Sequence, residues 1–353
     1  IQALHGHEHM AISQIDTHME QGAFNILPAL KDGVSRGESD EEGGGKIVNR
    51  TTLGIQTAGL TTDRIGLLCA GLAAVGFSGK AILVKLAYRY GVDAETLLAL
   101  RMAFSLPFFI VMGWMSARHG ADRLTLRDGV WLFGLGLFGY YLASYLDFLG
   151  LRYISAALER LILFVYPTLV VLLSALLFGQ RLTGRVFAAL VLCYAGIALA
   201  VVHDLRLAGS PQDLAVGSLL VFGSALSYAL YLLGNGRVIH RLGTVRVTAV
   251  ASGVACLLAL GQFLLLRPLA TLIQPGAVYG LAVAMALFST VLPVWLLSEA
   301  IRRIGAGPVA LTGSLGPIVT LLLAWLLLDE GLGGVQLAGA ALVIAGVTVM
   351  ARR

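Results

Sequence analysis

Long apolar runs separated by short polar turns dominate the chain from Ile65 onward. Each run is close to the ~20 residues that an α-helix needs to cross the hydrocarbon core of a bilayer. The pattern predicts ten spans, at roughly 65–87, 95–115, 129–149, 155–178, 185–203, 214–234, 246–266, 277–300, 307–328 and 335–351. The composition agrees, because only 13% of the residues are charged, whereas soluble domains carry about 25%. The predicted fold class is therefore an all-α integral membrane protein.

The stretch 151–201 recurs without a gap as 301–351. The coinciding residues include the pairs Arg152/Arg302, Pro167/Pro317 and Gly196/Gly346. We therefore expect two repeats, one over 64–203 with helices 1–5 and one over 214–351 with helices 6–10. An odd number of crossings per repeat makes the repeats run in opposite directions, which places a substrate site between them near mid-depth of the membrane.

Arginines are distributed unequally between the two sets of predicted loops. Twelve lie at one set of helix ends and four in the opposite loops. Cytoplasmic loops carry the excess of Lys and Arg, so both termini are expected in the cytoplasm. The expected topology is that of a multi-pass membrane protein.

Six ionisable residues lie within the predicted spans of the first repeat: Lys80, Lys85, Arg101, Asp147, Glu159 and Arg160. Each costs ~2.5–3.5 kcal/mol by insertion scales, which makes each a candidate for a functional site. All six fall in the outer part of the membrane, so we expect them to pair around a cavity. The alternatives are snorkelling to the interface for those near span ends, and a static Lys80–Glu159 ion pair that only holds helices together.

Polar stripes occupy single faces of three predicted helices. Tyr140, Ser144 and Asp147 share one face of helix 3, because they are spaced i, i+4, i+7. Glu159 and Tyr166 align on helix 4, and helix 6 carries the stripe Ser224, Ser227, Tyr228, Tyr231 and Asn235. For serines we favour a role in linking helices, and for tyrosines a role in lining a wet path.

Prolines lie inside four predicted spans, at Pro107, Pro167, Pro293 and Pro317. Each removes a backbone donor and is expected to kink its helix. Packing is the alternative role.

Residues 1–63 differ in composition from the rest and are predicted to form a disordered tail. Four histidines there, at 5, 7, 9 and 18, raise a metal-binding alternative, but the lack of a folded context or nearby cysteine argues against it. Cys69, Cys193 and Cys256 lie in apolar runs and are expected to be packing residues. No metal site, cofactor or nucleic-acid partner is expected.

Three segments carry a resemblance to a known family. They are GKAILVKLAYRYGVDAETLLALR at 79–101, LRYISAA at 151–157 leading to Tyr166-Pro167, and IGAGP at 304–308 leading to Gly316-Pro317. With the two repeats, they resemble the drug/metabolite transporter superfamily and, within it, the EamA-type transporters. The resemblance covers about residues 65–351 and implies ten helices in two five-helix repeats. It also implies export or uptake of small metabolites such as amino acids, by a protein of the inner membrane of a bacterial cell. Family members usually have an acidic residue after helices 4 and 9; Asp329-Glu330 fits this pattern, and Gln180-Arg181 does not.

The resulting prediction is a secondary transporter that works by alternating access on an amino acid or an organic anion. Its cavity would be lined by helices 1, 3, 4, 6, 8 and 9. The expected substrate-binding residues are Lys80, Arg101, Tyr140, Ser144, Glu159, Tyr166, Tyr228 and Tyr231. Glu159, with Asp147 as the alternative, would titrate if transport is coupled to protons. The partners expected are the substrate and the lipid bilayer, with a homodimer as one option for the assembly.

Two other functions remain open on the sequence. A membrane-embedded enzyme would need a catalytic constellation, but HExxH and GxSxG are absent and His119, His203 and His240 fall in predicted loops. Gly79-Lys80 resembles the end of a P-loop, although Ala74 and Ala81 replace two of its required residues. A non-transporting sensor or scaffold would be distinguished by the lack of substrate flux.

Overall fold

A computed structural model describes residues 64–118, 124–179, 184–207, 210–304, 309, 312–313, 315–331 and 333–351. Every regular element in these residues is a helix, as the apolar pattern predicts. Eight helices of the described chain are long and apolar enough to cross a membrane. Two shorter apolar helices, Gly316–Leu328 and Gly334–Val349, occupy the places of the last two predicted spans. The predicted tail at 1–63 lies outside the described residues.

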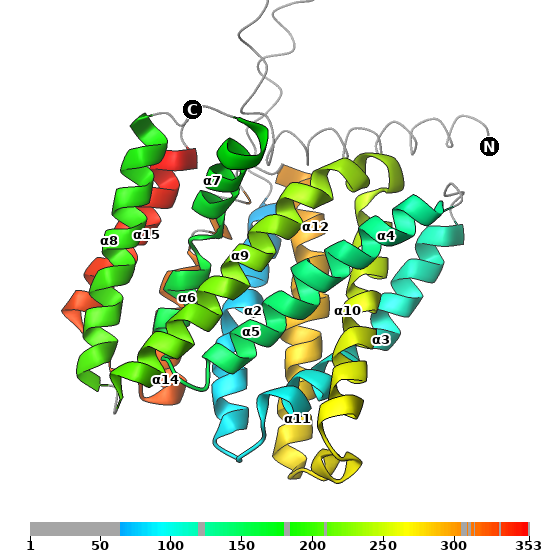
Figure 1. Cartoon of the computed structure of the whole chain (residues 1–353), viewed down its shortest axis with the longest axis horizontal. Coiled ribbons are helices and arrows are strands. Elements are labelled where there is room, and N and C mark those ends of the chain that lie inside the picture. Colours follow the sequence, from blue (N-terminus) through cyan, green and yellow to red (C-terminus); the bar gives the residue numbers. More distant parts are fainter. Residues whose placement is uncertain are drawn as a thin grey trace, which may run out of the picture.

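The helices form one bundle (Figure 1). The first half contains α2 (Arg64–Tyr88), α3 (Ala94–Arg118), α4 (Leu126–Leu135), the π-helical segment η1 (Gly136–Leu142), α5 (Ala143–Gly150), α6 (Ala156–Leu163), α7 (Tyr166–Phe178) and α8 (Gly184–Leu207). The second half contains α9 (Pro211–Leu242), α10 (Thr244–Leu266), η2 (Leu269–Leu272), α11 (Gly276–Ala286), the π-helical η3 (Leu287–Val291), α12 (Leu292–Ile304), α14 (Gly316–Leu328) and α15 (Gly334–Ala351).

The first helix of each half packs against helices of the other half. Helix α2 packs against α12 and α14, while α9, which holds the same place in the second half, packs against α5, α6 and α7. Gly66 on α2 lies against Ile304, and Gly217 on α9 lies against Ile154, which is 150 residues before Ile304. A Cβ at either glycine would meet the isoleucine side chain, so both contacts depend on a small residue.

The helices α8 and α15 show the relative direction of the halves. Gly196 packs against Gly339, and Gly346 packs against Ala189, so residue numbers rise along one helix as they fall along the other. Cys193 and Val343 lie 150 residues apart in the sequence, and the Cys193 thiol contacts the Val343 carbonyl oxygen at 3.7 Å. The two repeated stretches are thus antiparallel neighbours at one edge of the bundle (Figure 1).

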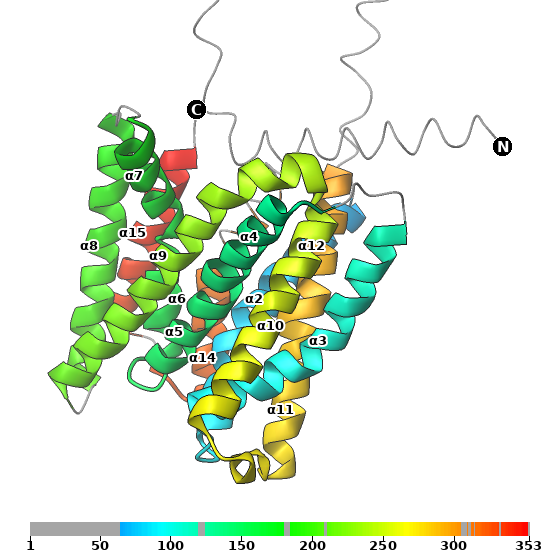
Figure 2. The ribbon, with the colours of Figure 1, turned by 45° about the vertical axis from the view of Figure 1, so that its right-hand side comes forward.

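A second pair of helices connects the halves on the other side. Figure 2 shows α3 and α10 side by side, and Met102 lies against Cys256 between them. Both residues are buried. Cys69 and Cys193 are also buried and unoxidised.

The prolines of the repeated stretch act differently from the prediction. Pro167 and Pro317 do not kink a continuous helix; each stands in the first turn of a new one, α7 and α14. A proline is well tolerated there because the first turn needs no N–H from it. Between α6 and α7 the chain leaves the helix at Phe164 and Val165. Helix 4 is therefore broken into two pieces.

Candidate functional site

Three charged side chains, two of them buried, meet near the end of the bundle at which α6 begins. The Lys80 Nζ on α2 is 2.6 Å from Asp147 Oδ2 on α5 and 3.5 Å from Glu159 Oε1 on α6. Asp147 is 1% exposed and Glu159 is fully buried, while the Lys80 side chain is 19% exposed. We call these three residues the charge cluster. Its carboxylates point into the bundle and away from lipid.

The charge cluster holds two carboxyl groups for one ammonium. The Asp147 and Glu159 carboxyl groups face each other within hydrogen-bonding reach. Apart from this contact and the Lys80 ammonium, the described residues offer their buried oxygens no hydrogen bond. Removing an ion from water costs several kcal/mol, and a single partner cannot offset that cost for two acids. Further positive charge lies in the field of the two acids without direct contact, from Arg160 and Lys85 at Glu159 and from Arg101 at Asp147.

Arg101 on α3 lies apart from these ion pairs. Its Nε and Nη2 donate to Thr290 Oγ1 at 3.2 and 3.1 Å, and its guanidinium lies 5.4 Å from the centre of the Phe148 ring. Its Nη1 is buried and has no hydrogen-bond partner among the described residues. Of the six charged residues expected to pair, only Lys80, Asp147 and Glu159 thus form ion pairs with one another. Because Thr290 belongs to η3, Arg101 links the two halves.

The other two charges of this group have different neighbours. Lys85 is half-buried and lies in the field of Glu330 and Asp204 as well as Glu159. Arg160 packs against the start of α14, where a Cβ on Gly316 would meet its guanidinium.

Four tyrosines from three helices form a continuous ring cluster. The ring centres of Tyr166 and Tyr228 are 5.1 Å apart, those of Tyr228 and Tyr231 5.5 Å, and those of Tyr231 and Tyr140 5.2 Å. The Tyr140 and Tyr231 hydroxyls share a hydrogen bond of 3.1 Å, and Asn235 donates to the Tyr231 oxygen. This tyrosine cluster joins residues of both halves, so it brings together four of the predicted site residues.

The serines of the stripe on α9 mainly link helices. Ser224 donates to the Ala143 carbonyl and Ser227 to the Phe138 carbonyl, each at 2.7 Å. Both carbonyls lie on the η1–α5 stretch, where the π-helical turns shift the backbone. Ser144 is half-buried and lies on this stretch between Tyr140 and Asp147.

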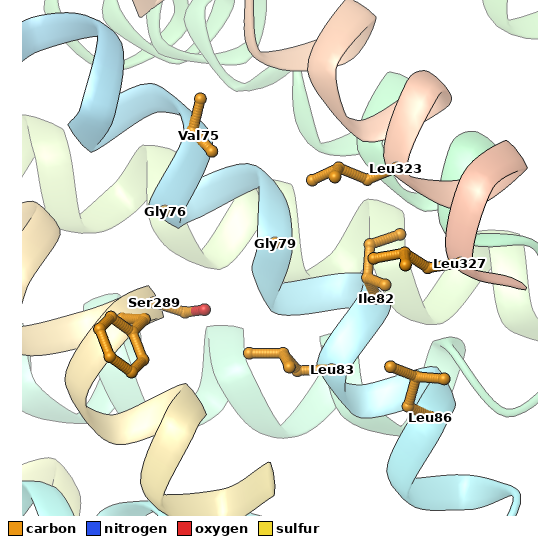
Figure 3. Close-up of a pocket in the computed structure, with 10 residues that line it drawn as sticks. Val75, Gly76, Gly79, Ile82, Leu83, Leu86, Ser289, Leu323 and Leu327 are labelled. Carbon is orange, nitrogen blue, oxygen red and sulfur yellow. The ribbon is translucent and has the colours of Figure 1, made fainter.

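An open apolar groove of about 220 Å³ lies on another face of α2. Figure 3 shows Leu83 and Ile82 of α2 beside it, with Leu323 and Leu327 of α14 along one side and Ser289 on the other. Val75 and Leu327 are 45% and 51% exposed, so the groove opens outward. Gly79 faces this groove while the next residue, Lys80, reaches the charge cluster. The groove is therefore separate from the charges, which are enclosed by protein.

Some polar neighbours of the site were not among the predicted residues. Thr290 holds Arg101, and Tyr88 donates to the Phe148 carbonyl at 2.6 Å. The repeat offered a signal for Thr290, because it is the 150-residue counterpart of Tyr140.

The prediction that His203 and His240 lie in loops was wrong. Both belong to helices, α8 and α9, since these helices continue past the apolar run. His203 Nδ1 is 3.6 Å from Asp204 Oδ1. His119 lies outside the described residues.

Comparisons with known proteins agree on one kind of molecule. The sequence matches the model of the EamA-like transporter family over residues 64–202 and again over 215–352. The uncharacterized transporter YcbK of Bacillus subtilis is 30% identical over 293 residues, which cover 80% of this chain and 91% of that protein. The uncharacterized transporter YyaM of the same organism is 26% identical over 248 residues, covering 69% and 80%. A solved crystal structure matches with a TM-score of 0.57 at 21% identity, covering 81% of this chain and 96% of that one, which speaks for the fold alone.

Proposed function

Because the chain belongs to the EamA-like transporter family, we propose that it is a secondary transporter that moves a small metabolite across a bacterial inner membrane by alternating access. The observation that carries this proposal is the charge cluster, enclosed within a bundle of two packed repeats. Charges inside a membrane bundle are costly and mark substrate or ion pathways by default. Family membership also speaks against an enzyme.

The proposed architecture is ten crossings arranged as two inverted repeats. The antiparallel contact of α8 with α15, which are counterparts in the repeat, supports it. Inverted repeats place the binding site at their interface. The tyrosine cluster and the Arg101–Thr290 link both lie at contacts between the halves.

The proposed substrate is an amino acid or an organic anion. Lys80 and Arg101 would hold its anionic group, and the unpaired Nη1 of Arg101 is a donor suited to a carboxylate oxygen. The tyrosine cluster and Ser144 would line the path, with rings for apolar parts and hydroxyls for polar parts of the substrate.

Coupling to protons is assigned to Glu159, with Asp147 as the alternative carboxylate. A proton on one of them leaves one ammonium for one carboxylate, which removes the charge imbalance of the cluster. The excess of arginines at the opposite ends of the helices supports an orientation with the α6 end outside the cell and both termini inside.

The test begins with the substrate, found by comparing metabolites in medium and cells with and without the protein. Flux of that metabolite is then measured in reconstituted vesicles over a range of pH. Glu159→Gln should flatten the pH dependence, whereas the matched control Glu299→Gln should leave it unchanged, since Glu299 pairs with Arg303 far from the charge cluster. A pH dependence that survives Glu159→Gln would remove Glu159 from the coupling role, and survival in Asp147→Asn as well would remove proton coupling by this cluster. Absence of any flux would refute the carrier.

A further inference from the structure

Glu330 joins the end of α14 to the start of α6. Its Oε1 accepts a hydrogen bond from the Ala156 N–H at 3.0 Å and its Oε2 one from the Ala157 N–H at 3.4 Å. The first N–H groups of a helix have no partner within the helix, so a carboxylate placed there satisfies them and meets the positive end of the helix dipole. Glu330 thus caps a helix of the first half from the second half.

The backbone around Glu330 is shaped for this contact. Asp329 ends α14 with a left-handed φ of 59°, the only non-glycine with positive φ among the described residues. This conformation turns the chain so that the next side chain points back across the bundle. Arg89 closes the same corner by donating to the Leu328 carbonyl at 2.8 Å.

Helix α6 is short and is followed by a break in the helix. It spans eight residues, Ala156–Leu163, and the chain leaves the helix at Phe164 and Val165 before α7 begins. Its start is held by Glu330 and by the Ser155 N–H, which donates to Asp204 Oδ2 at 3.3 Å. Glu159 stands in its first turn, only three residues beyond Ala156. Any displacement of the start of α6 therefore moves Glu159 relative to Lys80.

We infer that Glu330 is a positioning residue for Glu159: it latches the start of α6 onto the second half, and its release lets α6 swing on the Phe164–Val165 break and opens the charge cluster to water at this end of the bundle. The inference rests on the proposed function, since an opening of this kind serves a carrier. It adds a residue outside the predicted site and names the segment that moves.

The test labels a reporter cysteine with a maleimide on the full-length protein in detergent, where both ends are accessible, in a background in which Cys69, Cys193 and Cys256 are replaced by alanine. Ala157→Cys places a thiol at a position that is 1% exposed, next to the latch. Ala70→Cys lies near the start of α2, where the parent alanine is 3% exposed, and reports on the end of the bundle opposite to the latch. With Glu330→Ala, labelling at position 157 should rise about tenfold, the equivalent of ~1.4 kcal/mol, while labelling at position 70 should stay level or fall. Glu330→Gln keeps one acceptor for the Ala156 N–H but loses the second acceptor and the negative charge, so it should restore only part of the protection.

The matched control is Asp329→Asn, which removes a charge from the same turn and keeps a residue that tolerates the left-handed conformation. It should leave labelling at position 157 unchanged. Equal increases at positions 157 and 70 would mean general loosening and would overturn the latch, as would unchanged labelling in Glu330→Ala. If Glu330→Ala does not fold, Glu330→Gln decides: labelling faster than that of Asp329→Asn at position 157 alone supports the latch, and labelling equal to it refutes it.

The outcome is separable from that of the proposed function. A labelling change at position 157 together with pH-independent flux in the parent protein would keep the latch and reject Glu159 as the coupling residue.

Discussion

Lys80 is the residue whose loss should damage the protein most. Lys80→Met keeps the length of the side chain but leaves Asp147 and Glu159, both buried, without their ammonium. Removing one partner from a buried ion pair costs about 3–5 kcal/mol. Since 1 kcal/mol moves the midpoint of thermal unfolding by about 2–4 °C in chains of 150–250 residues, we expect the apparent midpoint to fall by roughly 6–20 °C.

The assay is thermal unfolding in detergent, at a fixed heating rate and at neutral pH. Asp147→Asn should also lower the midpoint, and the double variant Lys80→Met/Asp147→Asn should lose less than the sum of the single losses, by at least ~1 kcal/mol, because the two residues contact each other. Arg118→Met is the control, since Arg118 stacks on Trp114 at the opposite end of the bundle; its midpoint should shift by no more than about 2 °C. Additive losses, or a Lys80→Met midpoint close to that of the parent protein, would show that the three charges are not coupled and would remove the basis for the site.

Three further changes test other parts of the structure. Gly196→Leu should separate α8 from α15, because a Cβ at position 196 already meets the Gly339 carbonyl. We expect it to lower the stability by more than ~2 kcal/mol in the same unfolding assay. Gly253→Leu is the control, because a Cβ at position 253 meets nothing within 4 Å. Burial raises the pKa of Glu330 and outweighs the donors Ala156 and Ala157 and the nearby Lys85, which lower it, while Asp204 adds to the rise. The closed latch therefore holds a proton more tightly than the solvated carboxyl does. Because every thiol reacts more slowly at low pH, the measurement is the ratio of labelling at Ala157→Cys to labelling at Ala70→Cys; this ratio should fall as the pH falls towards the Glu330 pKa, and a ratio that rises would contradict the sign. Tyr231→Phe should cost only ~0.6–1.7 kcal/mol, the range for a hydrogen bond between membrane helices, yet it should alter the substrate KM if the tyrosine cluster lines the path; unchanged KM and kcat would assign the cluster to packing.

The all-helical fold followed from the sequence because the apolar run length is a strong constraint in a bilayer. The repeat was visible because some of the residues that coincide after a shift of 150 are needed at close helix contacts. Gly196 and Gly346 both lie between α8 and α15, and Ile154 and Ile304 each face a glycine of the other half. The break in helix 4 was harder to predict. A proline inside an apolar run is compatible with a kink or with the first turn of a new helix, and only the backbone at Phe164 and Val165 distinguishes them.

The site was predictable in its residue types and less so in its partners. Burial cost alone selected Lys80, Asp147 and Glu159, since charged side chains in a bilayer need one another. Arg101 was expected in the same group, but its partner is a hydroxyl, Thr290, that carries no signal in composition. Glu330 escaped notice as a partner of α6 because its contact is with backbone N–H groups, and these are identical at every residue.

The contact between Cys193 and Val343 joins two positions related by the 150-residue repeat. Contacts of this kind, in which a position meets its own equivalent, normally belong to isologous dimers of identical subunits, where one substitution changes both sides at once. Here the two sides lie in one chain and can differ. The Cys193 thiol faces Val343, and Gly196 faces Gly339, whereas the equivalent contact of Gly346 is with Ala189. Because both sides are encoded separately in one chain, each surface can change by substitution without the other, which the two faces of an isologous dimer cannot do.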